Sequence, residues 1–332
     1  MNKILTVSIA AYNVQDYIDN ALKSLLVKNI DDLEILVEDD GGKDNTANIV
    51  KEYEKKYPGI VKLVHKENGG YGSTINKSIE IAQGKYFKQL DGDDWYDSEN
   101  FEKLLELLRK IDTDCVYTSY KEFLENSSEY NNKDFFEDKV NGKYDFENII
   151  TKTNHHLNMY TLCYKTELLR KLNVKLLHKC LYTDTQYALY PIVGVKDIYI
   201  THEPIYIYRI GRKEQSVSIE SRKKHYEDSI KVSYEINKYY QEKCLNISDN
   251  VRSYILNYIT QTTQGTIMDF LMLLPVRKKN LKIIREFDEN IKMTNIEVYN
   301  EMANKRKLIR YLRKSNYRLY VLISIWHKMR FK

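Results

Sequence analysis

Two hydrophobic periodicities alternate along the first 120 residues of the chain. Short, nearly continuous apolar runs are typical of buried strands, and they occur at 4–10, 33–38, 60–65, 85–90 and 114–120. Segments with an apolar residue every three or four positions have the pattern of a helix with one buried face, and they occur at 14–26, 44–57, 73–83 and 98–111. Strands that alternate with helices predict an α/β fold, a mostly parallel sheet with helices on both faces.

The remaining chain has a different pattern. Residues 121–215 are irregular, and long helical patterns then follow at 221–242, 250–273, 278–289 and 305–328. We therefore expect an α/β domain over 1–218, with halves of about 1–120 and 121–218, and a C-terminal helical region over 219–332 that ends in a basic amphipathic helix.

Composition narrows the class of protein. Hydrophobic residues make up 42% and charged residues 30% of the 332 positions, as in soluble globular proteins. The four cysteines form no C-x-x-C pair and are expected to be free thiols in a reducing compartment. The apolar start lacks a clear cleavage region, and no run of eighteen apolar residues occurs. These features predict a cytoplasmic protein.

Three carboxylates, Asp91, Asp93 and Asp94, follow the predicted strand 85–90 directly. Carboxylates this close repel one another, and a hard divalent cation such as Mg²⁺ or Mn²⁺ relieves that repulsion, with substrate phosphates completing its shell. A solvated acidic turn is the alternative for so short a pattern. Polar residues also follow two other predicted strands, at 11–13 and 39–45, and ligands bind at this edge of such sheets. That convergence favours the metal site.

Acids after a strand also occur in response-regulator receiver domains. In that fold the acids follow the first strand, whereas Asp39 and Asp40 follow the second. The receiver interpretation is therefore rejected. The ordered segments 7–13, 33–46, 68–94 and 182–192 together resemble an inverting family 2 glycosyltransferase of the GT-A fold, of the bacterial surface-polysaccharide type.

The resemblance implies a donor site for a nucleotide-sugar, expected to be a UDP-sugar, in the first half and an acceptor site in the second. Asp40 would accept a hydrogen bond from the uracil N–H, with Asp39 beside it. The residues that would border the nucleotide are Ala10, Tyr12 and Asn13. The residues that would shape the pocket under the nucleotide-sugar are Asn68, Gly69 and Gly70.

The resemblance also assigns the chemistry. Asp91 and Asp93 would form the D-x-D pair for Mn²⁺ or Mg²⁺, with Asp93 as the metal ligand and Asp91 near the ribose or the metal. Asp184 would be the catalytic base, although Thr183 stands where the family usually has Glu. Capping of the next helix is the alternative at this position. Arg209 and Arg212 would contact the diphosphate or an anionic acceptor, unless they lie in a solvated basic loop.

The C-terminal segment 304–332 contains ten Lys or Arg, and no acidic residue follows Glu301. As one helix it would gather Leu308, Leu312, Leu319, Leu322 and Trp326 on a single face. An apolar face with cations opposite is typical of a helix on an anionic membrane surface; a helix docked on its own domain is the alternative. No nucleic-acid motif is present, so no nucleic-acid partner is expected.

The predicted function is sugar transfer from a UDP-sugar to a hydroxyl of a glycan or lipid-linked acceptor, at the inner face of the cell membrane. Two alternatives stay open: a sugar nucleotidyltransferase, which would release pyrophosphate, and a non-catalytic membrane-associated scaffold with the same fold. The oligomeric state is also open, since the helices beyond residue 220 fit either a dimer interface or a cover over the acceptor site.

Overall fold

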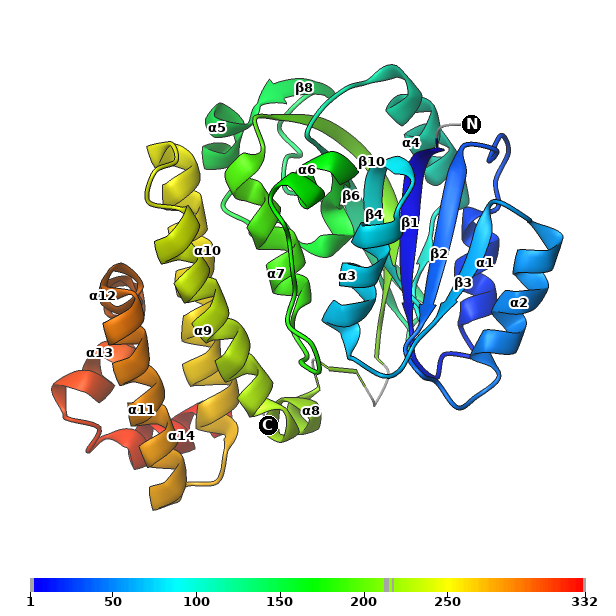
Figure 1. The fold of residues 1–332 in the computed structure, drawn as a ribbon. Coiled ribbons are helices and arrows are strands. Elements are labelled where there is room, and N and C mark those ends of the chain that lie inside the picture. The colour runs from blue at the N-terminus through cyan, green and yellow to red at the C-terminus, as the bar shows by residue number, and fades with distance from the viewer. Residues whose placement is uncertain (1–2, 212–214, 217, 331–332) are drawn as a thin grey trace. The chain divides into compact units, whose positions relative to one another are not determined.

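The computed structural model describes residues 3–211, 215–216 and 218–330. The chain divides into two compact units, residues 1–212 and 213–332 (Figure 1). The first unit contains all strands of a ten-stranded sheet, and the second is helical. The expected combination of an α/β fold and a C-terminal helical region is thus confirmed.

The first half of the sheet is parallel, with strand order β3-β2-β1-β4. Its strands are β1 (Lys3–Ala11), β2 (Leu33–Asp39), β3 (Val61–His65) and β4 (Gly84–Asp91). The helices between and after them are α1 (Ile18–Leu25), α2 (Thr46–Lys56), α3 (Tyr71–Ile81) and α4 (Ser98–Lys110). Figure 1 shows α3 on the opposite side of these strands from α1 and α2. Burial on both faces explains why the strands are apolar, as with the fully buried Leu5, Val7 and Ile9.

The second half makes the sheet mixed. The short strand β9 (Leu162–Lys165) lies antiparallel between β4 and β6 (Cys115–Leu124), and β6 pairs in parallel with β10 (Asp197–Ile210). Three further antiparallel strands are β5 (Trp95–Tyr96), β7 (Glu129–Lys133) and β8 (Gly142–Asp145). The short helices here are α5 (Phe146–Ile149), α6 (Thr166–Lys171) and α7 (Asp184–Leu189). Strands β7, β8 and β9 have four or five residues each, too few to show a hydrophobic period, so much of the segment 121–215 looks irregular in sequence.

The second unit consists of helices α8 (Ile219–Lys224), α9 (Tyr226–Lys243), α10 (Asp249–Gly265), α11 (Lys278–Thr294), α12 (Ile296–Lys305), α13 (Lys307–Lys314) and α14 (Tyr320–Met329). The single helix expected over 305–328 is wrong. Asn316 and Tyr317 have φ angles of 48° and 62°, so the chain turns between α13 and α14. Such left-handed backbone ends a helix.

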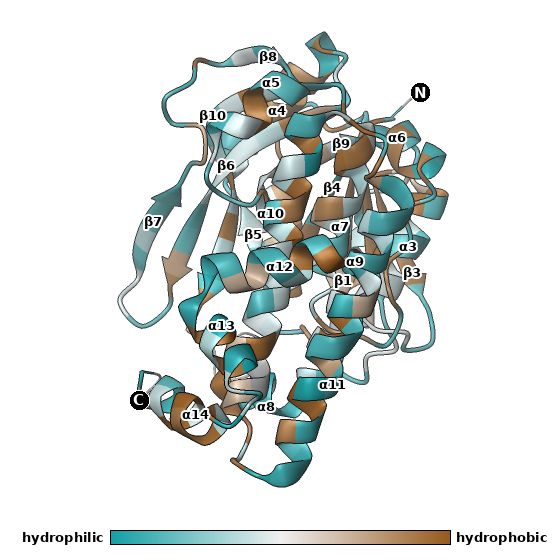
Figure 2. Cartoon of the chain, turned by 90° about the vertical axis from the view of Figure 1, so that its left-hand side faces the viewer, coloured by the Kyte–Doolittle hydropathy of each residue, from teal (hydrophilic) through white to brown (hydrophobic). Residues whose placement is uncertain are grey.

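The break separates two kinds of surface. In α13, Ile309 and Leu312 are buried, and Arg313 forms a 2.6 Å ion pair with Asp288 of α11. This helix is therefore docked on its own unit, and the expected lipid-facing role of Leu312 is wrong. In α14, one side stays exposed and apolar (Figure 2). It comprises Val321, Leu322, Ile325, Trp326 and Met329, which we call the α14 apolar face. No described helix is both long and apolar enough to cross a membrane.

Candidate active site

The ends of three parallel strands bring the predicted polar clusters to one edge of the sheet. Ala10 of β1 pairs with Asp91 of β4, and Ala11 pairs with Asp39 of β2. Asp39 in turn pairs with His65 at the end of β3. The convergence expected from sequence is therefore present, because parallel strands end at the same edge.

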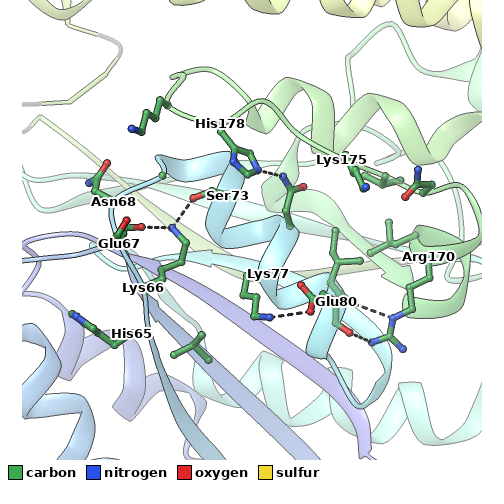
Figure 3. Close-up of a pocket in the computed structure, with 18 residues that line it drawn as sticks. His65, Lys66, Glu67, Asn68, Ser73, Lys77, Glu80, Arg170, Lys175 and His178 are labelled. Atoms are coloured by element: carbon green, nitrogen blue, oxygen red, sulfur yellow. Dashed lines mark hydrogen bonds and ion pairs between the residues drawn. The ribbon is translucent and has the colours of Figure 1, made fainter.

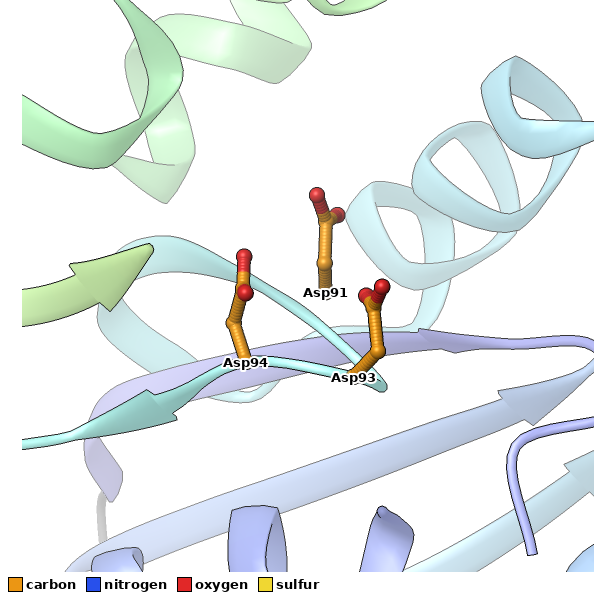
Figure 4. Close-up of side chains that lie close together, drawn as sticks. All are labelled: Asp91, Asp93 and Asp94. Atoms are coloured by element: carbon orange, nitrogen blue, oxygen red, sulfur yellow. The ribbon is translucent and has the colours of Figure 1, made fainter. Parts of the chain in front are cut away.

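Asp91, Asp93 and Asp94 place one carboxylate oxygen each within 4.8 Å of one another, and Figure 4 shows the three side chains extending to the same side. Both oxygens of Asp94 accept hydrogen bonds, one from the Tyr206 hydroxyl (2.6 Å) and one from the Arg209 backbone N–H (2.8 Å). Within the described residues, the Asp91 carboxylate accepts one hydrogen bond, at Oδ1 from the Tyr71 hydroxyl (2.8 Å). Asp94 is therefore held by the protein, whereas Asp91 keeps an oxygen for a ligand.

These carboxylates lie in an unfavourable electrostatic environment. Burial raises the pKa of Asp91 to about 7, and the neighbouring charge of Asp93 adds to the rise. Burial, followed by the charges of Asp93 and Asp91, also raises the pKa of Asp94. A bound cation would reverse both effects, because it favours the ionised carboxylates. The oxygen-only donor set and its mutual repulsion fit Mg²⁺ or Mn²⁺.

Asp40 organises the loop that leads from β3 into α3. Its two oxygens accept backbone N–H hydrogen bonds from Gly69 (2.9 Å) and Gly70 (2.8 Å), and it also pairs with Lys66. Gly70 has φ 79° and ψ 167°, a conformation that is essentially confined to glycine. A Cβ atom there would approach the Lys179 backbone to 2.9 Å. Protein groups thus already bind both oxygens of Asp40. Its expected hydrogen bond with the uracil N–H stays a prediction.

The other predicted donor residues lie along the same edge. Asp39 accepts a hydrogen bond from the Gly42 backbone N–H (3.0 Å) and pairs with His65 (2.7 Å). The Ala10 carbonyl accepts the Gly92 backbone N–H (3.0 Å), which fixes the turn that carries Asp93. The exposed residues of the set are Tyr12, Asn13 and Asn68. The Asn13 side chain accepts a 2.8 Å hydrogen bond from the Lys43 backbone N–H, which joins the loops after β1 and β2.

Asp184 is the first residue of α7, and Thr183 occupies the N-cap position without a side-chain capping bond. Burial raises the pKa of Asp184, while hydrogen bonds from its own and the Thr185 backbone N–H lower it in part. The charges of Asp91 and Asp184 both raise the pKa of Tyr71, after the larger effect of burial. Asp184 is thus near enough to Tyr71 and Asp91 for its charge to raise the pKa of both, although it lies more than 90 residues beyond Asp91 in sequence.

Arg209 braces the acidic turn. It lies in β10, donates from Nε to the Asp93 carbonyl (3.1 Å) and pairs with Glu125 (3.1 Å). Its guanidinium lies 4.8 Å from the ring centre of Trp95 and 5.1 Å from that of Tyr17. This placement rules out the solvated basic loop for Arg209. Arg212 lies outside the described residues.

Sequence reasoning missed Tyr71 and Tyr206. Tyr71 binds Asp91, and Tyr206 donates to Asp94 while accepting the Asp91 backbone N–H (3.2 Å). With 29 tyrosines in the chain, no single one stands out. The position of Tyr71, directly after the Asn68–Gly70 segment, was the one local signal available.

Comparisons with known proteins agree with this geometry. The family model described as glycosyl transferase family 2 matches residues 6–173. Among curated relatives, the putative glycosyltransferase EpsH of Bacillus subtilis is 36% identical over 112 residues, which are 34% of this chain and 32% of EpsH. Chondroitin synthase of Escherichia coli is 35% identical over 117 residues, 35% of this chain and 17% of that protein. The chain thus spans about a third or less of these relatives.

A solved structure extends the likeness of fold to nearly the whole chain. S. aureus TarS 1-349 in complex with UDP superposes with a TM-score of 0.69 at 18% identity, covering 98% of this chain and 91% of that one. The mixed sheet with carboxylates at its parallel strand ends has the GT-A type of fold. This chain belongs to glycosyl transferase family 2.

Proposed function

We propose that this protein is a metal-dependent, inverting glycosyltransferase of surface-polysaccharide synthesis. It transfers a sugar from a UDP-sugar to a hydroxyl of a glycan or lipid-linked acceptor. The single observation that supports this most is the cluster of Asp91, Asp93 and Asp94, in which Asp91 is bonded to Tyr71 and feels the charge of Asp184. The cluster lies at the edge of the sheet where Asp40 anchors the β3–α3 loop. The UDP complex of TarS, which shares the fold, favours UDP as the donor nucleotide.

The donor site in this proposal consists of the loops after β1, β2 and β3. Uridine lies against Tyr12, Asn13 and the Asp39–Asp40 pair, and the sugar lies over Asn68–Gly70. The Gly69 and Gly70 N–H groups are already bound by Asp40, so the loop is rigid before the donor arrives. A preformed loop reduces the entropy lost on binding.

Asp93 and Asp91 are the proposed ligands of Mn²⁺ or Mg²⁺, which would neutralise charge on the leaving diphosphate. Asp94 is not included, because Tyr206 and the Arg209 backbone occupy its oxygens. Arg209 supports the turn through the Asp93 carbonyl. A contact between Arg209 and the diphosphate is not needed for this role.

Asp184 is the proposed general base. In a single displacement the acceptor oxygen attacks the anomeric carbon, its proton passes to the Asp184 carboxylate, and the bond from that carbon to the diphosphate oxygen breaks on the opposite face. Burial raises the pKa of Asp184, which strengthens it as a base. Hydrogen bonds from the first N–H groups of α7 keep the carboxylate ionised enough to act.

The α14 apolar face is the proposed contact with an anionic membrane, consistent with a lipid-linked acceptor at the inner face of the cell membrane. Trp326 and Leu322 are 41% and 65% exposed, and the Arg330 guanidinium lies 4.8 Å from the Trp326 ring centre. Apolar side chains enter the headgroup region while nearby cations pair with anionic lipids.

The test is a panel of nucleotide-sugars incubated with the protein and Mn²⁺, with release of nucleoside diphosphate as the readout. UDP release from one UDP-sugar is expected, with loss of about 100-fold or more in Asp93→Asn and Asp184→Asn. Asp138→Asn, at an exposed carboxylate outside the site, is the control. Release of pyrophosphate would point to a nucleotidyltransferase. Failure of every nucleotide to bind with metal would contradict the proposal.

A further inference from the structure

A cleft of about 970 Å³ lies beside the proposed donor site (Figure 3). Its walls are the end of β3 with the loop to Gly69, one side of α3, and the segment from α6 to Lys179. Pockets for organic ligands have volumes of roughly 300–1,000 Å³, so this one has room for several sugar units. The cleft shares Asn68 and Gly69 with the proposed donor site, and its other lining residues have no part in the proposed transfer reaction.

The lining of the cleft is basic. Its cationic side chains are Lys66, Lys77, Arg170, Lys175 and Lys179. The carboxylates among the lining residues are Glu67 and Glu80. Lys77 is paired with Glu80 (2.9 Å), and Lys66 is paired with Asp40. Three cations remain, Arg170, Lys175 and Lys179, and Glu67 is the one lining carboxylate left to balance them. The lining therefore carries a net positive charge.

Those three cations have no ion pair within the part of the chain that the structure describes. Lys175 and Lys179 are exposed. Arg170 is directed to carbonyl oxygens at the end of α3, at 2.9 Å from Ile79 and 2.6 Å from Ala82. Carbonyls orient a guanidinium without cancelling its charge. Unpaired cations in a concave surface concentrate field lines and attract anions.

The basic wall is held in place by specific bonds. The Asn76 side chain donates to the Leu176 carbonyl and accepts from the Leu176 backbone N–H, both at 2.8 Å. The Lys179 backbone N–H donates to the Gly69 carbonyl (2.6 Å). The wall and the donor loop therefore form one rigid unit, and five residues after Lys179 the chain reaches Asp184.

We propose that this cleft binds an anionic segment of the acceptor glycan, through phosphate or carboxylate groups carried along its chain. This inference rests on the proposed transferase function and names the class of its acceptor. Lys175 and Lys179 pair with the acidic groups, and the segment 175–183 guides the glycan toward Asp184. The reacting hydroxyl then lies one or more sugar units away from the bound anions.

The experiment measures binding of four probes to the full chain by calorimetry: a hyaluronan octasaccharide, a glycerol-phosphate octamer, a neutral dextran octasaccharide and inorganic phosphate. The variants are Lys175→Ala/Lys179→Ala and, as a matched control, Lys171→Ala/Lys196→Ala, which removes two exposed lysines outside the cleft. At least one anionic oligomer is expected to bind about 10-fold or more tightly than dextran. The cleft variant should lose about 3–10-fold of that affinity and the control none.

Equal binding of charged and neutral oligomers would overturn the inference, as would unchanged affinity in the cleft variant. Inorganic phosphate that binds as tightly as the glycerol-phosphate octamer would also overturn it, because the cleft would then be a site for a free anion. UDP binding with Mn²⁺ is measured on the same samples and should be unchanged in both variants. If UDP does not bind wild type, the proposed function fails, and the glycan result still reports on the cleft.

Discussion

The Tyr71 hydroxyl donates a 2.8 Å hydrogen bond to Oδ1 of Asp91, which ties the start of α3 to the proposed metal site at the end of β4. This bond links the loop that is proposed to shape the donor pocket to the carboxylate that would hold the metal. Tyr71 follows Gly70 directly, so the Asp40–Gly70 bond extends the same linkage to the end of β2.

Tyr71→Phe should lower kcat/KM by about 10-fold or more, because a hydrogen bond to a charged carboxylate contributes roughly 1.5–3 kcal/mol. The Mn²⁺ concentration that gives half-maximal activity should rise in this variant, because Asp91 loses the bond that orients it. Tyr53→Phe removes a similar bond, between Tyr53 of α2 and Asp19 of α1 (2.7 Å), which involves none of the proposed site residues, and it serves as the control. An unchanged metal titration in Tyr71→Phe would argue against a positioning role.

The pH–rate profile should show an acid limb that belongs to Asp184. Burial raises its pKa above 3.8, and the base acts only when ionised, so kcat/KM should fall as pH falls through that raised pKa. Asp184→Asn should lose the limb together with about 10²–10⁴-fold of the rate. The measurement is kcat/KM at saturating Mn²⁺ from pH 4 to about 8. A variant that retains both the limb and the rate would exclude Asp184 as the base.

Gly70→Ala should destabilise the first unit by about 1–3 kcal/mol, because alanine is strained at φ 79° and ψ 167°. The added methyl would also meet the Lys179 backbone. Urea unfolding measures the loss, and the Michaelis constant for the donor should rise because the loop shifts. Gly59→Ala is a useful comparison: φ is 75° there but no atom lies within 4 Å of the added carbon. Equal effects of both changes would mean that contact with Lys179 is unimportant.

Lys88 predicts a pH dependence of stability. It is fully buried in β4, donates to the Tyr160 carbonyl (2.8 Å), and burial lowers its pKa from 10.5 to about 8. Between these two values the unfolded chain holds a proton that the folded chain lacks, so Lys88 makes stability rise with pH in that window. Between these two pH values, the free energy of unfolding of wild type should rise by about 3 kcal/mol relative to that of Lys88→Met, at about 1.4 kcal/mol per pKa unit.

Denaturant unfolding of wild type and Lys88→Met at several pH values from about 7 to 10 measures this gain as a difference between two curves. The comparison cancels the titration of other groups, including the tyrosines. If the two curves of unfolding free energy against pH are parallel, the pKa of Lys88 is the same in the folded and unfolded chain, which would contradict the prediction.

The α14 apolar face should bind anionic vesicles. Leu322→Glu/Trp326→Glu should reduce co-sedimentation with phosphatidylglycerol-containing vesicles by 10-fold or more, at about 0.8 kcal/mol for each buried CH₂ lost plus two repelled charges. Met293→Glu, at an exposed methionine of α11, is the control. Vesicle binding that survives in the double variant would remove α14 from this role.

The sequence by itself determined the parallel half of the sheet, its covering helices and the carboxylates at the strand ends. Those features are local: each strand and helix shows its own hydrophobic period, and Asp91 and Asp93 directly follow a strand whose direction is set. The basic, acid-free C-terminal segment could also be predicted from the sequence, but the turn at Asn316–Tyr317 that divides it could not.

Only the tertiary structure decided which side chains support the acids. Tyr206 and Arg209 come from a segment more than 110 residues beyond Asp94 in the chain, and β9 enters the sheet between strands far from it in sequence. No local pattern encodes such contacts, because they arise when distant segments exclude water together. The same holds for the basic cleft, whose lysines acquire a common field only after α6 packs beside α3.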